Sequence, residues 1–167
     1  CAAAVSISDN TAANLLLSHL GGPEGLTKFL RASGDRETRL DRREPELNEN
    51  RKNDPRDTTT PMAMALTAER LLVRGGLSKP SQEKLHGWLI AATPGLDRLR
   101  AGLPKDWRLG DKTGTGGNGA HNDVAIAWPP DKRPILIACY MSESAVPNAD
   151  KAVAHADIAR IIAQEWG

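Results

Sequence analysis

The sequence is poor in aromatic residues and in cysteine. Tryptophan, tyrosine and phenylalanine together make up 4% of its 167 residues, and its two cysteines, Cys1 and Cys139, fit no metal-ligand spacing. Each cysteine is expected to act as a small buried apolar residue, and the spacing does not decide whether the two form a disulfide. We expect neither a metal site nor a cofactor.

The sequence also lacks an excess of charge of one sign and a long apolar run. It holds 22 Lys and Arg against 21 Asp and Glu, for a net charge of +1. The arginine-rich region 31–56 is balanced by acidic residues, which indicates internal pairing and argues against nucleic acid as a partner. No apolar run reaches the ~18 residues that a membrane span needs. With 40% hydrophobic residues, the chain is expected to be globular, without a membrane partner.

The most distinctive segment is a highly charged loop at about residues 39–57. The proline after Glu44 excludes a straight helix through that point. Asn48 follows Glu44 by four residues, a spacing that brings the two side chains together if the chain turns once between them. Arg42 and Asp57 could pair and close the neck of the loop. A carboxylate and an amide held together in this way can position a water molecule, which is a feature of hydrolases.

Capping residues, glycines and prolines predict an α+β architecture in two parts. Residues 1–96 are expected to be all-helical apart from the charged loop, and residues 97–167 to form an antiparallel sheet covered by a C-terminal helix. Helices are expected over about 11–20, 23–32, 60–73, 79–89, 96–102 and 149–166, and strands over 107–115, 122–128 and 135–141.

Three finer expectations concern packing. The apolar run 135–141 suggests a strand that is buried on both faces. The last helix offers its apolar side chains to the sheet, and three histidines are expected on helix surfaces. The apolar set is Val153, Ile158, Ile161 and Ile162, and the histidines are His19, His86 and His155.

Two short motifs carry polar groups that suit chemistry. Ser8-Asp9-Asn10 precedes a helix, and by itself it reads as an N-cap. Lys112-Thr113-Gly114-Thr115 ends the first expected strand, where Gly114 would let a ligand approach the backbone and the lysine and hydroxyls could bind a carboxylate. Taken alone, the second motif is more often a strand that runs into a turn.

The combination is more specific. Ser8-Asp9-Asn10, Glu44-Pro45-Glu46-Leu47-Asn48 and Lys112-Thr113-Gly114 occur in the order found in class A serine β-lactamases, which the chain resembles over essentially its whole length. The resemblance implies a β-lactamase/transpeptidase-like fold, a periplasmic or secreted location and a β-lactam antibiotic as substrate.

In that family the nucleophile is a serine followed three residues later by lysine, upstream of Ser-Asp-Asn. Only seven residues precede Ser8, and the chain begins at Cys1 without a methionine or a signal peptide. We therefore expect the Ser-x-x-Lys segment to be missing, the fold to be incomplete, and the N-terminal portion of the same enzyme to be a required partner.

The resemblance also implies roles for particular residues. Glu44 matches the glutamate that activates the deacylating water, and Ser8 matches the hydroxyl that relays a proton to the departing lactam nitrogen. Lys112 matches the cation that favours negative charge in the pocket. Family members pair an arginine with the substrate carboxylate. Arg98 is favoured for this role over His121, which stands where many members have that arginine. The residues implied to bind substrate or water are Asn10, Asn48, Thr113, Gly114, Thr115 and Arg98.

Two alternatives remain beside a β-lactamase. One is a penicillin-binding module that is acylated without turnover, which the pair Glu44 and Asn48 argues against. The other is an inert fragment or one half of a complementing pair. The isolated chain is expected to be inactive, and to fold poorly because strand 135–141 would have an unpaired edge.

Overall fold

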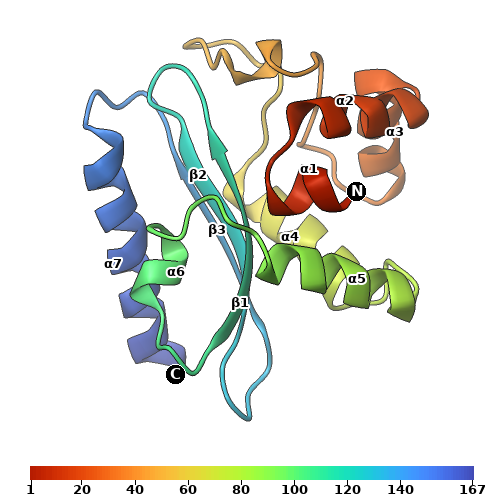
Figure 1. Cartoon of the computed structure of the whole chain (residues 1–167). Coiled ribbons are helices and arrows are strands. Elements are labelled where there is room, and N and C mark those ends of the chain that lie inside the picture. Colours follow the sequence, from red (N-terminus) through yellow and green to blue (C-terminus); the bar gives the residue numbers. More distant parts are fainter.

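The computed structural model describes residues 1–167 and shows a three-stranded antiparallel sheet between two groups of helices (Figure 1). The strands are β1 (Arg108–Thr115), β2 (His121–Trp128) and β3 (Ile135–Met141), in the spatial order β1-β2-β3. The helices are α1 (Ala2–Ser6), α2 (Asn10–His19), α3 (Gly22–Ala32), the 3-10 helix η1 (Glu46–Asn48), α4 (Pro61–Leu72), α5 (Lys79–Ile90), α6 (Leu99–Gly102) and α7 (Asn148–Trp166).

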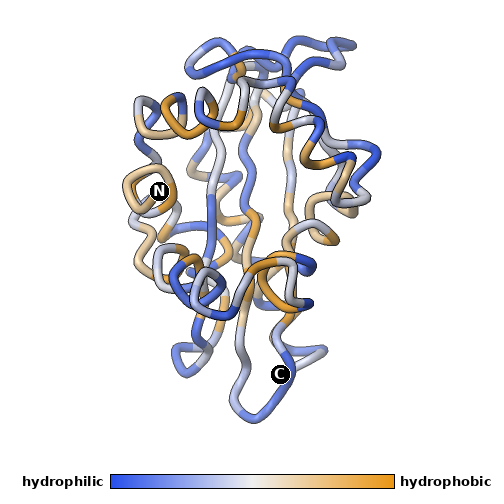
Figure 2. Tube along the Cα trace, turned by 90° about the vertical axis from the view of Figure 1, so that its right-hand side faces the viewer, coloured by the Kyte–Doolittle hydropathy of each residue, from blue (hydrophilic) through white to orange (hydrophobic).

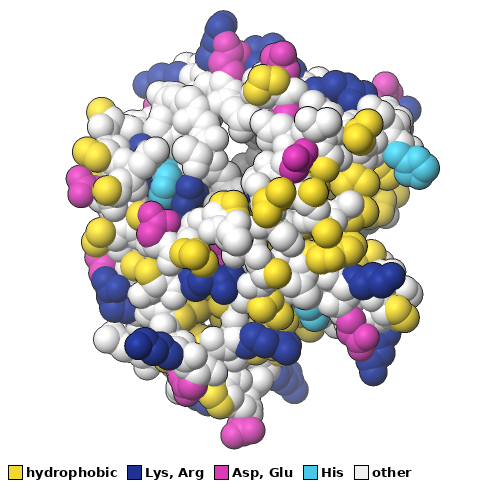
Figure 3. Space-filling model, in the orientation of Figure 1, with side chains coloured by type: hydrophobic (Ala, Val, Ile, Leu, Met, Phe, Trp, Pro, Cys, Tyr) yellow, Lys and Arg dark blue, Asp and Glu magenta, His cyan; other side chains and the backbone are white.

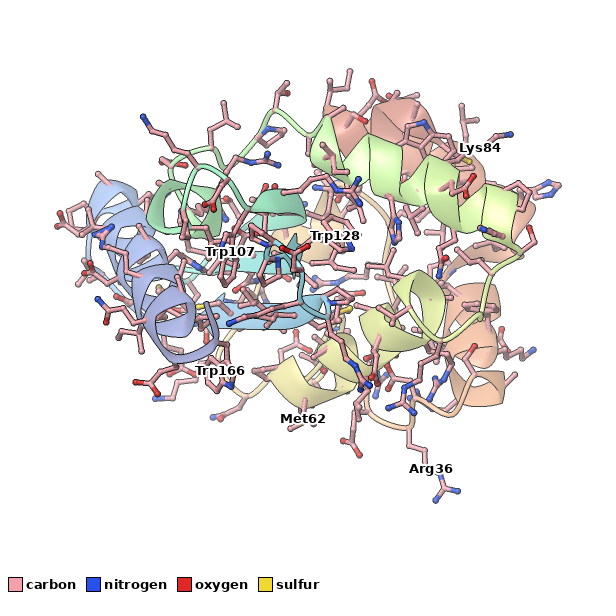
Figure 4. All side chains as sticks on the ribbon, turned by 90° about the horizontal axis from the view of Figure 1, so that it is seen from below. Arg36, Met62, Lys84, Trp107, Trp128 and Trp166 are labelled. Atoms are coloured by element: carbon pink, nitrogen blue, oxygen red, sulfur yellow. The ribbon has the colours of Figure 1, made fainter.

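Side chains alternate between the two faces of the sheet, and each face has its own core. Helices α6 and α7 cover one face, while α4 and α5 cover the other (Figures 1 and 4). Ala125 and Ala127 of β2 point to α7, and Ile126 between them points to α4 and α5. The first core is Leu99, Trp107, Leu109, Ala125, Ala127, Ile137 and Ala159, and the second is Ala68, Leu72, Leu89 and Ile126.

The local signals for helix ends act as the sequence predicts. Asp9 caps α2 by accepting a hydrogen bond from the Ala12 N–H at 2.6 Å, and Thr60 caps α4 through the Ala63 N–H at 3.1 Å. Most element ends lie within a few residues of those expected. Residues 96–98 are not helical, however, so α6 begins only at Leu99. None of the helices combines the length and the apolarity needed to cross a bilayer.

The expectation of surface histidines is wrong for two of the three. His155 is fully buried, and its Nε2 lies 3.1 Å from the His121 carbonyl oxygen. His86 is half-buried against the edge of the Trp128 ring, with its Nε2 3.0 Å from the Leu72 carbonyl oxygen. Only His19 is exposed.

Helix α7 packs on the sheet through a different stripe from the one expected. Its buried positions include Ala152, His155, Ala156 and Ala159, which share one face at helical spacing. Small residues on this face let the helix lie close to the sheet and to α6. Val153 and Ile161 therefore point away from the sheet and are exposed, whereas Ile158 and Ile162 pack against the core.

Strand β3 is not buried on both faces, as its apolar run suggested. It forms one edge of the sheet, and Ile137 is its only buried residue. An open groove of about 760 Å³ runs along it, and nine hydrophobic residues, Tyr140 among them, line the groove together with Pro61 and Pro134. Both cysteines are free, which the spacing had left open. Burial was expected for each, but Cys1 is exposed and Cys139 is half-buried.

Candidate active site

A cavity of about 510 Å³ lies where the start of α2, the charged loop and strand β1 meet. All nine residues that the sequence singled out line it, although they come from four separate segments of the chain. They are Ser8, Asn10, Glu44, Asn48, Arg98, Lys112, Thr113, Gly114 and Thr115. The fold therefore brings the predicted set together.

The charged loop is closed at its neck as the sequence predicts. Arg42 Nε donates to Asp57 Oδ2 at 2.7 Å, and Arg42 also pairs with Glu49 across the loop at 2.6 Å. Asp57 Oδ1 accepts the backbone N–H groups of Asp41 and Arg42 at 2.7 and 2.9 Å. Because the side chain of Asp57 is only 3% exposed, this carboxylate holds both ends of the loop from inside.

Within the loop, Glu44 and Asn48 are joined side chain to side chain. The peptide bond between Glu44 and Pro45 is cis, and η1 follows it. Asn48 Nδ2 donates to Glu44 Oε2 at 2.5 Å and to the Pro45 carbonyl oxygen at 3.1 Å. The second oxygen of Glu44 makes no hydrogen bond within the protein and is free to accept one from a water molecule.

Asn14 of α2 fixes the backbone of Glu44, and sequence reasoning missed it. Its Nδ2 donates to the Glu44 carbonyl oxygen at 2.9 Å, and its Oδ1 accepts the Glu44 N–H at 3.1 Å. The amide thus pairs with both backbone groups of the one residue. No local pattern marks this contact, because Asn14 and Glu44 are 30 residues apart.

Ser8 and Lys112 face each other across the cavity. Lys112 Nζ donates to Ser8 Oγ at 2.8 Å and to the Thr113 carbonyl oxygen at 2.8 Å. An ammonium has three donors, so one remains for a ligand. Burial lowers the pKa of Lys112, and the nearby Asp111 carboxylate opposes that shift. Ser8 has a positive φ of 57°, which turns the chain before the Asp9 cap and aims the hydroxyl at β1.

Arg98 lies beneath the end of β1, beside Thr115. Its guanidinium donates to the Gly114 and Asn122 carbonyl oxygens at 2.9 and 2.6 Å and to Thr115 Oγ1 at 2.6 Å. His121 pairs with Thr115 in the strand register, is 3% exposed and does not line the cavity. Burial, with Arg98 nearby, lowers the pKa of His121 to about 4. Of these two residues, only Arg98 lines the cavity.

The backbone of β1 also faces the cavity. Gly116 N–H donates to the Ala120 carbonyl oxygen at 3.1 Å, so these two residues form a hydrogen-bonded pair. Along an antiparallel ladder, hydrogen-bonded pairs alternate with non-hydrogen-bonded pairs. Thr115 is therefore at a non-hydrogen-bonded position, and its N–H points to the open edge of β1. A Cβ at Gly114 would meet nothing closer than 3.9 Å, so a side chain there would fit but would extend into space that the glycine leaves open.

Two glycines of the β1–β2 hairpin hold the charged loop close, which the sequence did not reveal. Gly117 N–H donates to the Asn48 carbonyl oxygen at 2.7 Å. A Cβ at Gly116 would lie 2.7 Å from that oxygen, and one at Gly117 would lie 2.4 Å from the Glu49 carbonyl oxygen. The loop and the hairpin meet at the hydrophilic upper end of the molecule (Figures 1 and 2).

The expectation that the chain contains no Ser-x-x-Lys needs one correction. Ser81 is followed three residues later by Lys84. Both residues are exposed on α5, neither lines the cavity, and Lys84 points outward from that helix (Figure 4). Ser81 Oγ accepts a hydrogen bond from Ser78 and makes none with Lys84. The Ser-x-x-Lys motif is therefore present in the sequence, but it does not lie at the candidate site.

The hydroxyl of Ser8, the ammonium of Lys112 and the carboxylate of Glu44 with its amide partner thus line one cavity. Such groups suit a hydrolase in which side chains donate and accept the protons of the reaction. Comparison with known proteins agrees. A model described as the β-lactamase enzyme family matches residues 1–166, and the chain belongs to that family.

Its relatives are β-lactamases of about twice its length. The β-lactamase of Streptomyces lavendulae is 52% identical over 137 residues, 82% of this chain and 45% of the relative. That of Streptomyces albus G is 44% identical over 167 residues, 100% of this chain and 53% of the relative. The structure of an ancestral (GNCA) class A β-lactamase matches with a TM-score of 0.98 at 54% identity, over 99% of this chain and 64% of that one. The chain thus has the class A fold and spans about half the length of these curated relatives.

Proposed function

We propose that the protein hydrolyses β-lactam antibiotics through an acyl-enzyme, and that Glu44 activates the water that cleaves it. The observation that carries this proposal is the Glu44 carboxylate, held by Asn48 at 2.5 Å in the same cavity as Ser8 and Lys112. As an exported enzyme it would meet the antibiotic in the periplasm or outside the cell.

Deacylation is the step for which this chain supplies the base. An ionised carboxylate accepts a proton from water as the water attacks the ester carbon. Asn48 occupies one oxygen of Glu44 and keeps the side chain from rotating, so the other oxygen takes the water proton. The fixed backbone of Glu44, bound by Asn14, adds to this alignment.

Ser8 and Lys112 serve the step in which the lactam C–N bond breaks. The departing nitrogen needs a proton, and the Ser8 hydroxyl can pass one to it while its oxygen takes a proton from the Lys112 ammonium across their hydrogen bond. The Thr115 N–H, directed to the open edge of β1, is one donor to the developing oxyanion. Asn10, at the start of α2, lines the opposite wall, where it can bind the amide side chain of the substrate.

The substrate carboxylate would bind at Thr113, Thr115 and Arg98. Substitution Arg98→Ala is expected to raise KM for a penicillin about 10- to 150-fold, with less effect on kcat, because a hydrogen bond to a charged group contributes about 1.5–3 kcal/mol. Steady-state kinetics measure both constants. Arg108→Ala, which removes an exposed arginine at the start of β1, is the matched control and should leave KM within about 2-fold. An unchanged KM in Arg98→Ala would exclude this arginine from carboxylate binding.

The nucleophile is proposed to come from a segment beyond these 167 residues, the N-terminal portion of the same enzyme. The curated relatives are about twice as long as the matched region. The groove along β3 and the exposed hydrophobic residues at the helices provide the surface for that portion. Hydrophobic side chains also lie on the face seen in Figure 3, on the side of the N-terminal helices. The exposed set includes Ile7, Leu15, Leu20, Phe29, Met62 and Leu66.

A chimera tests the proposed function. The part of the Streptomyces lavendulae β-lactamase that precedes its matched region is joined to this chain. We expect the chimera to hydrolyse a chromogenic cephalosporin, measured by absorbance, and Ser8→Ala to slow it. A folded chimera that binds the cephalosporin covalently but releases no product would support the penicillin-binding alternative instead.

A further inference from the structure

Two aspartates lie buried side by side on the face of the sheet that α6 covers. Asp111 of β1 and Asp123 of β2 are both 0% exposed. Asp123 pairs with Thr113 in the strand register, and Thr113 is two residues after Asp111. The two carboxylates are therefore diagonal neighbours on one face of the sheet, close enough for the charge of Asp111 to act on Asp123.

Each carboxyl group uses one oxygen to hold α6. Asp111 Oδ1 accepts a hydrogen bond from Arg100, and Asp123 Oδ2 accepts the Leu99 N–H at 3.3 Å. The other oxygens, Asp111 Oδ2 and Asp123 Oδ1, are buried and have no partner. Two buried acceptors without donors are costly, and one proton placed between them would satisfy both.

We propose that Asp111 and Asp123 share one proton between these two oxygens, and that the pair positions Arg98 by fixing the start of α6 against the sheet. Arg98 is the residue directly before Leu99, so the Asp123–Leu99 hydrogen bond sets the backbone from which the guanidinium extends towards Thr115. Both aspartates are positioning residues, since neither lines the cavity. The role of Arg98 rests on the proposed function, but the shared proton does not.

The charged groups around the pair do not replace the proton. Arg100 binds Asp111 alone, and the three hydrogen bonds of the Arg98 guanidinium go to two carbonyl groups and Thr115 and not to either aspartate. Lys112 points to the opposite face, towards Ser8. The remaining titratable neighbours are Asp97 before α6, Cys139 opposite Asp123 on β3, and His121 and His155, whose pKa values burial lowers.

Burial, and secondly the charge of Asp111, raises the pKa of Asp123 to about 7. Burial also raises the pKa of Asp111, against the pull of Arg100. The folded protein then holds a proton that the unfolded chain releases near the ordinary value of 3.8. The stability that the pair contributes is complete below that value, declines as pH rises, and is lost once pH passes about 7.

The test is a carboxyl ¹³C NMR titration of the full chain with labelled aspartate. If the chain alone aggregates, the titration is done on the chimera. We expect Asp123 to titrate near pH 7, and Asp111→Asn to lower that midpoint by at least one unit, because the charge is removed and the amide can donate. Asp35 is the internal control: it is 5% exposed but accepts hydrogen bonds from Thr38 and Thr67, so its pKa is low and should not move. A midpoint for Asp123 near 4, or one unmoved by Asp111→Asn, would overturn the shared proton.

The positioning role has its own readout. Asp123→Asn keeps a donor for Asp111. It should leave the Arg98 Nε–H chemical shift unchanged and KM within about 2-fold of the parent, while removing the titration near pH 7. Asp123→Ala should shift that resonance and raise KM at least 5-fold, with kcat less affected. If Asp123→Ala unfolds, Asp123→Ser, which can still donate, takes its place. An Arg98 resonance and KM untouched by loss of the carboxyl in a folded variant would refute the positioning.

Discussion

Replacing Glu44 by glutamine in the chimera should stop the reaction after acylation. Glutamine keeps the size of the side chain and can still contact Asn48, but it cannot accept a proton from water. General-base catalysis contributes about 10²- to 10⁴-fold, so kcat should fall by that factor. In the proposed mechanism Glu44 acts as the base in deacylation, so a burst of one equivalent of product should precede the slow phase in a stopped-flow trace. Mass spectrometry should then show the covalent adduct.

Glu46→Gln is the matched control, because Glu46 is an exposed carboxylate two residues away in η1. It should leave kcat within about 2-fold, as surface substitutions usually do. Equal losses in the two variants would indicate damage to the loop and not the loss of a base. A Glu44→Gln variant with the parent kcat would exclude Glu44 as the base, and the proposed deacylation mechanism with it.

The 167-residue chain alone should give no turnover of the same cephalosporin. The cavity holds no serine with a lysine three residues on, because Ser81 and Lys84 are exposed on α5. Of the two oxyanion donors that the proposed mechanism needs, it offers only the Thr115 N–H, and losing one donor of two costs roughly 3 kcal/mol. The rate should be that of buffer, followed by absorbance at high protein concentration. Turnover that disappears on Glu44→Ala would show that the chain carries its own nucleophile.

The same chain should also associate in solution. Strand β3 has an open edge and lies beside an apolar groove, and such edges pair with other chains. Size-exclusion chromatography should show oligomers, and thermal unfolding should be broad. The chimera should elute as a monomer, since its added half is expected to cover this edge. A sharp two-state melt and a monomeric profile for the chain alone would contradict an incomplete fold.

The sequence was sufficient where chemistry follows from near neighbours in the chain. Glu44, with a proline after it and Asn48 four residues on, is expected to form a compact turn in any context, and the structure has it. The ion pair between Arg42 and Asp57 follows from the need to close a loop. Capping residues and glycines also placed most helix and strand ends, because those signals act within one turn.

Burial was decided by contacts that local patterns do not contain. His155 looked like a surface histidine, but α7 lies on the sheet through its alanine face and carries the imidazole inside. The run 135–141 looked doubly buried because apolar composition does not say whether a neighbouring strand is present. Here β3 is an edge, and its hydrophobic residues line an open groove.

By itself, the sequence determined which residues could do the chemistry and the order of the elements that carry them. Only the tertiary structure decided that Ser8, Glu44, Arg98 and Lys112 share one cavity, and that Asn14 and Gly117 hold the loop in place. It alone brought Asp111 and Asp123 together. The physical reason is that hydrogen bonding and burial depend on distances in space, and residues 30 or more positions apart acquire those distances only when the sheet and its helices pack.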